Sequence, residues 1–276
     1  MITDKIESYL MSKGKTLNEE LLNLSSIKFQ ESIKRQLMQD KTEKLNHLYT
    51  TLITKSCARQ SAYKYHGFEG EELSARTLVN FLMGDLAEIA FLILAELAGA
   101  KIEGNNTELK INEGDLSFTC RPDGVYLDPK TGKSYNVEIK KMSEYAFDEW
   151  KEGTLDDTWG YRTQAMMECR AWKEAGKDVV GTAFLGMRGI TGHFHEEIIP
   201  FEPGLVDKAL NRAKQVVSST KEELPIRGVA PEAETFRNKP TGKERLNVVC
   251  QYCPYKQHCY PDFKMELKGG YPRWLR

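Results

Sequence analysis

The residues with the clearest chemical potential are three cysteines near the end of the chain, in the segment "VVCQYCPYKQHCY": Cys250, Cys253 and Cys259. Thiolates at such short spacing commonly hold a metal or a metal cluster, and four ligands are the usual requirement. Cys120 and Cys169 fall in a predicted strand and a predicted helix beside apolar residues, and we interpret both as core residues. Cys57 lies in a segment without apolar periodicity, so we predict that it is the fourth ligand.

A second candidate site begins with the segment "VEIKK". Residues two apart in a strand share a face, so Glu138 and Lys140 are expected to project together while the Ile139 side chain points the other way. An exposed ion pair is the alternative, because the chain repeats this spacing elsewhere, for example at Glu149 and Lys151. The apolar neighbours of Glu138 favour an internal strand, where charged groups must be paired or bound.

Two further carboxylates are expected beside this strand. Asp123 lies in "RPDG", on the preceding strand of a predicted hairpin, and Glu88 lies in a helix among apolar residues, at the seam between helix and sheet. A solvated glutamate is the alternative for Glu88, and Asp85 is expected on the outer face of the helix. Converging carboxylates repel one another unless a cation lies between them. Oxygen ligands of this kind suit Mg²⁺ or Mn²⁺.

The elements that must position these residues alternate between helices and strands. Residues 1–45 are predicted as a helical N-terminal layer, and 71–99 as the strongest helix. Strands are expected at 116–127, 134–142, 178–187 and 193–201, and helices at about 157–176 and 204–220; a proline-containing loop follows at 224–246. The order indicates one α/β domain, divided into a helical region 1–70, a catalytic core 71–222 and a cysteine region 223–276.

Composition is that of a globular protein: 276 residues, 40% hydrophobic, with a net charge of −1. The longest apolar stretch, 86–100, is interrupted by glutamates and is expected to be too short and too charged to span a membrane. The N-terminus lacks a secretory pattern, so we expect a cytoplasmic protein, in which six cysteines suggest metal rather than disulfides.

The order "GDLAE", "RPDG", "EIK" and then a helix bearing Gln164 resembles the PD-(D/E)xK nucleases of the RecB-like exonuclease branch. The resemblance implies a restriction-endonuclease-like core, a central mixed β-sheet flanked by helices. It also implies that Glu88, Asp123 and Glu138 bind the divalent metal together with the Ile139 carbonyl. Lys140 becomes the catalytic lysine and Gln164 the supporting residue.

Two positions depart from the family pattern. Many relatives with a cysteine cluster carry a histidine where Glu88 falls. The family often has a tyrosine four residues after the glutamine, where this chain has Glu168, and Tyr161 could take its place.

One upstream cysteine followed by C-x2-C-x5-C is similar to the iron–sulfur nucleases, including the CRISPR-associated single-strand exonucleases and the AddB-type recombination nucleases. The resemblance implies a [4Fe–4S] cluster on Cys57, Cys250, Cys253 and Cys259. Structural Zn²⁺ is the alternative, since four thiolates also suit that ion.

These features predict a metal-dependent DNA exonuclease that acts on single strands or free ends in recombination, repair or CRISPR-type processing, with a possible helicase or recombination partner and no membrane. A non-catalytic nucleic-acid-binding scaffold and a zinc-stabilised restriction-like endonuclease are the alternatives. Weak candidates for DNA contacts are basic and aromatic residues, although ordinary packing explains them almost as well: Arg59, Tyr63, Lys64, Arg121 and Tyr161.

Overall fold

The computed structural model describes residues 1–12, 18–38, 47–105, 107–153, 155–268 and 271–276. The chain forms two compact units. The first comprises Met1–Glu43, Leu73–Asp156 and Arg162–Asp207, and the second comprises Lys44–Glu72, Asp157–Tyr161 and Lys208–Arg276. The mixed α/β class and the helical N-terminal region agree with the sequence prediction, of which residues 13–17 and 39–45 lie outside the described part. The division of one domain into the regions 1–70, 71–222 and 223–276 stays a prediction.

The first unit is built around a mixed sheet with the strand order β2-β5-β6-β7-β8. Its strands are β2 (Ile102–Glu103), β5 (Gly124–Leu127), β6 (Ser134–Met142), β7 (Val179–Arg188) and β8 (Phe194–Pro200). The β6 and β7 strands run parallel because the chain between them forms the helices α6 (Glu144–Glu152) and α7 (Tyr161–Glu174), whereas the other neighbours are antiparallel. The strands expected at 178–187 and 193–201 are therefore confirmed, as the antiparallel neighbours β7 and β8.

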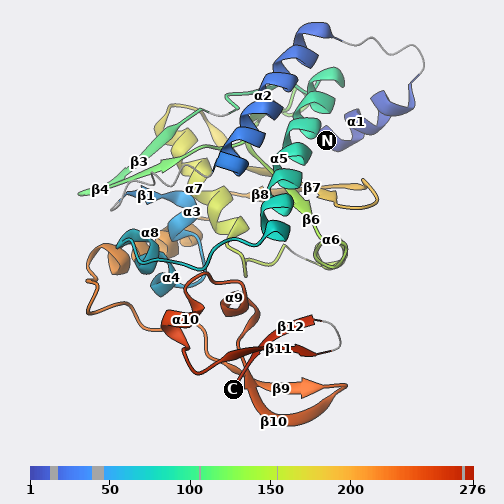
Figure 1. The fold of residues 1–276 in the computed structure, drawn as a ribbon. Helices are drawn as coiled ribbons and strands as arrows, with labels where there is room; N and C mark the ends of the chain where they lie inside the picture. The colour runs from blue at the N-terminus through green and yellow to red at the C-terminus, as the bar shows by residue number, and fades with distance from the viewer. Residues whose placement is uncertain (13–17, 39–46, 106, 154, 269–270) are drawn as a thin grey trace. The chain divides into compact units, whose positions relative to one another are not determined.

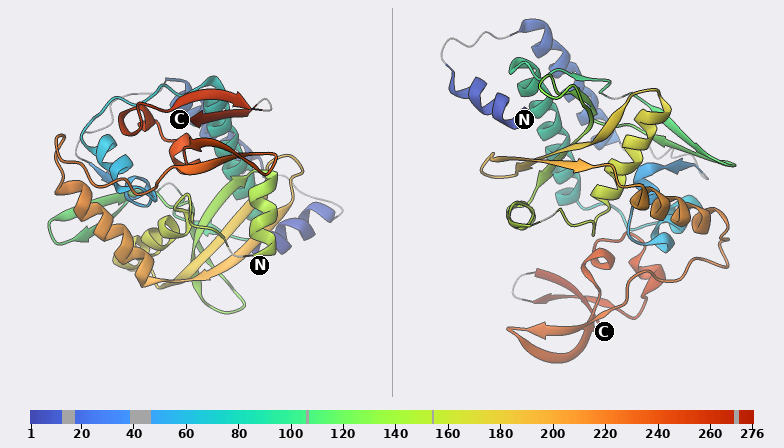
Figure 2. Two further views of the ribbon diagram at one scale, coloured as in Figure 1. Left: turned by 90° about the horizontal axis from the view of Figure 1, so that it is seen from below. Right: turned by 180° about the vertical axis from the view of Figure 1, so that it is seen from behind.

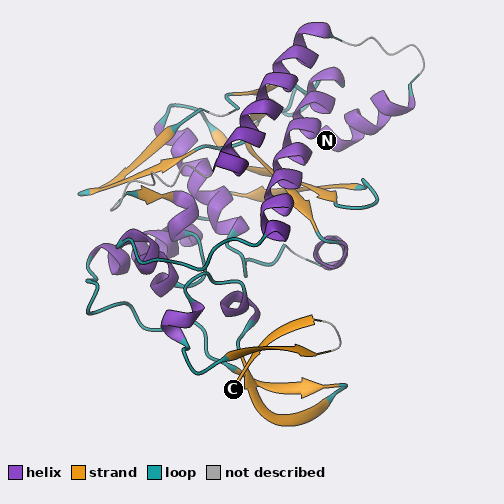
Figure 3. Ribbon diagram, in the orientation of Figure 1, coloured by secondary structure: helices purple, strands orange, loops and turns teal. Residues whose placement is uncertain are grey.

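Helices α1 (Ile2–Met11), α2 (Glu19–Met38) and α5 (Ala75–Leu97) form the helical layer of this unit, and α2 lies beside α5 in Figures 1 and 3. Ser74 caps the N-terminus of α5. Its hydroxyl accepts a hydrogen bond from the amide of Thr77 and so satisfies one free donor of the first turn. Ile6 and Phe91 from these helices pack with Val137 and Ile139 of β6 in one core.

By length and composition alone, α5 could cross a membrane, a test that core helices of globular proteins also pass. The helix is longer than the stretch 86–100, so the expectation that the apolar segment is too short was wrong. Residues 75–85 lengthen the helix, and the polar residues among them interrupt the run of apolar residues.

The predicted strand 116–127 is two strands in different sheets. The first part, β4 (Leu116–Cys120), pairs with β3 (Leu109–Glu113), and the second part, β5, pairs with β2 and β6. Pro122 lacks the N–H that would continue a ladder, and Gly124 has φ 145°, so the chain changes direction between the two. A Cβ on Gly124 would lie 2.4 Å from the Ile102 side chain, so the close approach of β2 requires glycine.

In the second unit, short elements surround the cysteines, and the β9–β10 hairpin lies beside the β11–β12 hairpin (Figure 2). The elements are β1 (Leu48–Tyr49), α3 (Thr50–Ile53), α4 (Ala58–Tyr65), β9 (Glu232–Phe236), β10 (Lys239–Arg245), α9 (Val248–Gln251), α10 (Lys256–Cys259), β11 (Lys264–Lys268) and β12 (Tyr271–Leu275). Helix α8 (Pro203–Val217) runs through the boundary between the units in sequence. The predicted loop 224–246 was wrong in part, because β10 is exposed along most of its length and its polar sequence carries no period-2 signal.

Candidate functional site

The alternation of β6 places Glu138 and Lys140 on one face of the sheet and Ile139 on the other, as predicted. Ile139 belongs to the core under α5, while Glu138 and Lys140 form an ion pair. The Glu138 side chain is only 1% exposed, so this is not a solvated surface pair. Oε2 of Glu138 is buried and has no hydrogen-bond partner among the residues that the structure describes.

Asp123 is fixed at the start of β5, next to this pair. Its Oδ2 accepts a hydrogen bond of 2.7 Å from the backbone amide of Ile139, and its own carbonyl accepts one of 2.9 Å from Asn105. Burial raises the pKa of Asp123 well above its ordinary value, and the charges of Glu138 and Glu88 raise it further. The β5–β6 hairpin therefore brings two carboxylates together, with the Ile139 amide on Asp123 and the Lys140 ammonium group on Glu138.

Glu88 is oriented by helix α5 and joins the same electrostatic group. Burial raises its pKa, the charges of Asp85 and Glu138 add to the effect, and Lys140 opposes it. Asp85 does not lie on the outer face as expected, because its carboxylate binds Arg35 at 2.8 Å and Gln36 at 2.9 Å. These contacts dock α2 on α5 one turn before Glu88.

Lys140 is held in its charged form. Burial works against an ammonium group, but the carboxylates of Glu138 and Asp123 outweigh it and raise the pKa of Lys140. The group therefore donates hydrogen bonds and supplies positive charge at neutral pH.

Helix α7 covers this face of the sheet and carries Gln164. Its Nε2 donates to Oε1 of Glu138 at 3.2 Å and to Oε1 of Glu168 at 2.9 Å. Glu168 is 1% exposed, and burial and the charge of Glu138 raise its pKa well above the ordinary value. Our sequence reasoning treated Glu168 as a departure from a pattern and missed it as a member of the site, although its spacing from Gln164 places both on one helix face.

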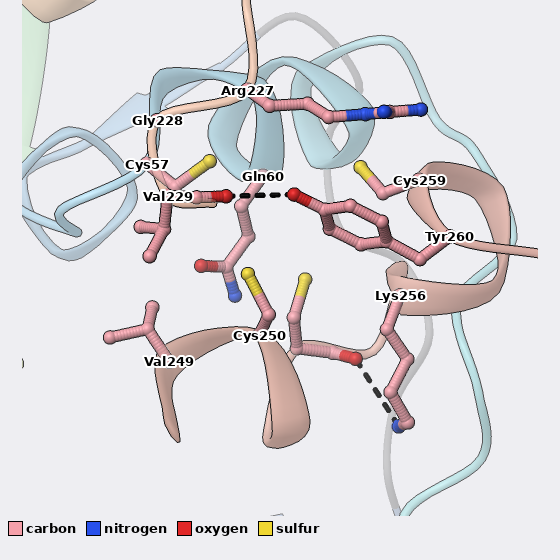
Figure 4. Close-up of a pocket in the computed structure, with 11 residues that line it drawn as sticks. Cys57, Gln60, Arg227, Gly228, Val229, Val249, Cys250, Lys256, Cys259 and Tyr260 are labelled. Carbon is pink, nitrogen blue, oxygen red and sulfur yellow. Dashed lines mark hydrogen bonds between the residues drawn. The ribbon is translucent and has the colours of Figure 1, made fainter. Parts of the chain in front are cut away.

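The four cysteines chosen from the sequence line one pocket in the second unit (Figure 4), together with the side chains of Val229 and Val249 and the cations Arg227 and Lys256. The sulfur atoms of Cys57, Cys250 and Cys259 point into it. The space is about 380 Å³, its opening to solvent included. Cys120 and Cys169 are buried in the first unit, as predicted for core residues.

Burial keeps the thiols of Cys250 and Cys253 neutral at pH 7. It raises the pKa of Cys250 to about 11 and that of Cys253 to about 12. A hydrogen bond between Arg59 Nε and Tyr63 Oη, at 3.3 Å, places the tyrosine hydroxyl 3.6 Å from Cys259 Sγ. His258 does not line the pocket and contacts the carbonyl of Glu69 instead.

Among the described residues, no group of three or more His, Cys, Asp or Glu side chains is arranged to hold a single metal ion as it stands. Four thiolates around one Zn²⁺ would bring their sulfurs to about 3.8 Å from one another, given Zn–S bonds of about 2.3 Å. The cysteines share a pocket without forming such a set. The carboxylates that the structure describes likewise do not form such a set.

The weak DNA-contact candidates are placed differently from one another. Tyr63 is 2% exposed and stacks on Tyr255, so its ring is not available to a base, and ordinary packing explains it. Arg59 contacts Tyr63 and the carbonyl of Pro225. Arg121 pairs with Glu108 at 2.8 Å on the surface. Lys64 is exposed, and Tyr161 is the half-buried first residue of α7.

Comparison with known proteins does not assign the chain to a family. No protein-family model matches the chain, and no curated protein matches it. It is similar to a solved structure described as "Crystal structure of SSO0001", with a TM-score of 0.47 and 14% sequence identity over 86% of this chain and 96% of the other. That likeness is too low to support an argument about fold or function.

Proposed function

We propose that the chain is a metal-dependent deoxyribonuclease of the PD-(D/E)xK type whose second unit binds a [4Fe–4S] cluster. The proposal rests on the site geometry and on the motif resemblance described above. The substrate suggested by the resemblance is DNA with free ends, single-stranded in preference, and the cleavage is expected to be exonucleolytic.

The observation that carries the proposal is the group of carboxyl side chains around Lys140, where burial and neighbouring negative charges raise the pKa values of Glu88, Asp123 and Glu168. Glu88, Asp123, Glu138 and Glu168 interact electrostatically, and Lys140 is the cation between them. Buried charge without a partner is costly, so a carboxyl group cluster of this kind indicates a binding or catalytic site. The partnerless Oε2 of Glu138 fits a hard divalent cation such as Mg²⁺ or Mn²⁺, with Glu88, Asp123 and the Ile139 carbonyl as further ligands.

A bound cation would screen the charge of a phosphodiester, lower the pKa of a water molecule and stabilise the leaving oxygen. Lys140 holds its proton, so it acts as a donor that orients water and phosphate rather than as the general base. Glu138 fixes the lysine through their ion pair, and the Ile139 amide fixes Asp123. Losing one such preoriented group typically lowers the rate about 10²–10³-fold.

The cysteine pocket fits a cluster better than a single zinc ion. Each thiolate of a [4Fe–4S] cluster ligates a different iron, so the sulfurs stand around a core instead of meeting at one atom. The four cysteines are spread around the wall of one pocket, which is the arrangement that a cluster requires. The group would link α4 to the C-terminal segment and so stabilise the fold around it.

The test is degradation of end-labelled linear and of circular single-stranded DNA in Mn²⁺ or Mg²⁺, with anaerobically purified protein. Loss of linear DNA only is the expected result and would support an exonuclease. Cutting of circles would keep the chemistry but make the enzyme an endonuclease. Absence of cleavage by protein that has bound both iron and Mn²⁺ would leave the nucleic-acid-binding scaffold as the better description.

A further inference from the structure

A buried chain of hydrogen bonds leads from the core of the first unit to the carboxylates. Trp172 Nε1 donates to Oδ1 of Asn136 at 3.1 Å, and Nδ2 of Asn136 donates to Oε2 of Glu168 at 3.2 Å. The indole nitrogen can only donate, so it fixes which end of the Asn136 amide faces Glu168. All three side chains are at least 96% buried, so water does not substitute for these contacts.

Glu168 in turn fixes the amide of Gln164. Nε2 of Gln164 lies 2.9 Å from Oε1 of Glu168 and 3.2 Å from Oε1 of Glu138. Two carboxylate acceptors on one NH₂ group determine the orientation of the amide and leave its carbonyl oxygen at the opposite corner. Without Glu168, Glu138 is the remaining acceptor and the amide can turn.

The residue type at 168 is specific to this task. The two oxygens of the Glu168 carboxyl group each accept from one amide, whereas a glutamine would present its own NH₂ group to either Gln164 or Asn136 and force one of them to rotate. An apolar side chain would satisfy packing alone, as the neighbouring Met166 and Met167 do, both fully buried. A glutamate with 1% exposure is therefore not explained by core packing.

We propose that Glu168 is a positioning residue of the active site, which holds the Gln164 amide so that Glu138 and the Gln164 carbonyl face the substrate and its metal. The inference rests on the proposed nuclease function and extends it to a residue that does not touch DNA. Glu168 acts through Gln164, so the two residues must behave as one unit.

The experiment compares Glu168→Gln, Gln164→Ala and the double variant in full-length, cluster-loaded protein. Cleavage of a labelled single-stranded oligonucleotide at saturating Mn²⁺ gives kcat and KM, and electron paramagnetic resonance of Mn²⁺ gives metal affinity without reference to cleavage. Glu174→Gln is the matched control, because Glu174 lies on the same helix in a partly exposed pair with Arg170. Trp172→Phe weakens the same chain more gently, should Glu168→Gln fold poorly.

We expect kcat of Glu168→Gln to fall about 10–100-fold, in the range typical of residues that orient a metal site. KM should stay within about twofold, Mn²⁺ affinity should weaken less than in Glu138→Gln, and the double variant should be no slower than the slower single variant. Trp172→Phe should give a smaller drop in kcat, and Glu174→Gln should match the wild type.

Multiplicative effects of the two single variants on kcat, or an unchanged kcat in Glu168→Gln, would overturn the inference. So would loss of Mn²⁺ binding as severe as in Glu138→Gln, since Glu168 would then be a ligand. If the wild type binds Mn²⁺ but cleaves nothing, the proposed nuclease function fails. Coupling between residues 164 and 168 in Mn²⁺ affinity would still establish the positioning role, and its absence would refute it.

Discussion

The carboxylate site and the cysteine pocket hold their reactive groups in opposite ways. The carboxylates are carried by long regular elements, α5, β6 and α7, and internal donors such as the Ile139 amide and Gln164 fix their positions. The cysteines lie in short helices and their flanking loops, and burial keeps at least two of their thiols neutral. Regular elements and internal donors orient the side chains of the first site, whereas short helices and loops carry those of the second. Variants should therefore affect them differently.

The largest effect is expected at β6. Glu138→Gln removes the negative charge that pairs with Lys140 and that would bind the metal, so kcat should fall at least about 10²–10³-fold while iron content stays unchanged. Steady-state cleavage and iron analysis measure the two quantities. The matched control is Glu149→Gln, which has the same acidic-x-lysine spacing on an exposed part of α6. Equal losses in both variants would contradict the assignment.

Loss of one pocket cysteine should affect stability more than chemistry. Cys57→Ser is expected to abolish iron incorporation and to lower the thermal unfolding temperature, because a ligand that binds only the folded state stabilises it. Iron content and calorimetry are the measurements. Cys120→Ala serves as the control, since Cys120 is buried outside the pocket and its loss should leave iron bound. Stoichiometric zinc without iron in the wild type would instead favour the zinc alternative.

The carboxylate site should make the metal-free protein less stable as pH rises. The pKa values of Glu88, Asp123 and Glu168 are raised by burial, so the folded state holds protons that the unfolded state has lost above about pH 4. The stability contribution of these groups is present at acidic pH and is lost as pH rises through their raised pKa values.

Mg²⁺ should therefore raise the unfolding temperature more at pH 8 than at pH 5.5. Calorimetry of the wild type and of Asp123→Asn measures this effect, and the variant should depend less on pH. A Mg²⁺ effect that is equal at both pH values would argue against a metal at these residues.

A smaller effect is expected from the tyrosine beside the cysteines. Tyr63 Oη accepts hydrogen bonds from Arg59 Nε and from the Cys259 thiol, and if Cys259 becomes a thiolate ligand the tyrosine hydroxyl would be the donor in that pair. Hydrogen bonds to cluster sulfurs raise the reduction potential. A bond worth about 1 kcal/mol corresponds to about 40 mV for one electron, so Tyr63→Phe should lower the midpoint potential by about that amount. Redox titration measures the midpoint potential, and an unchanged value would show that the Tyr63 hydroxyl does not donate to a cluster sulfur.

The smallest effect is expected at Arg121. Its exposed ion pair with Glu108 belongs to a class worth about 0.2–1 kcal/mol, so Arg121→Ala should change stability little. KM for DNA should change less than about twofold if the pair is its whole role. A larger increase in KM would restore Arg121 as a phosphate contact.

The sequence predicted the features that depend on neighbouring residues and missed those that depend on contacts between segments far apart in the chain. Strand alternation predicted that Glu138 and Lys140 share a face, and cysteine spacing selected the residues that line the pocket, because both signals are local. The burial of Tyr63 against Tyr255 and the role of Glu168 depend on contacts between distant segments, so no local pattern reveals them. The break between β4 and β5 was readable in "RPDG" in principle, because proline and glycine both interrupt a ladder.

The most direct test of the central claim is single-turnover cleavage of an end-labelled single-stranded oligonucleotide in Mn²⁺ by wild type and by Lys140→Ala, with Lys151→Ala as the matched control. We expect rapid cleavage by the wild type and by Lys151→Ala, and a rate at least about 100-fold lower for Lys140→Ala. Equal rates for all three proteins would show that the cleavage does not use this site, and the account would be wrong.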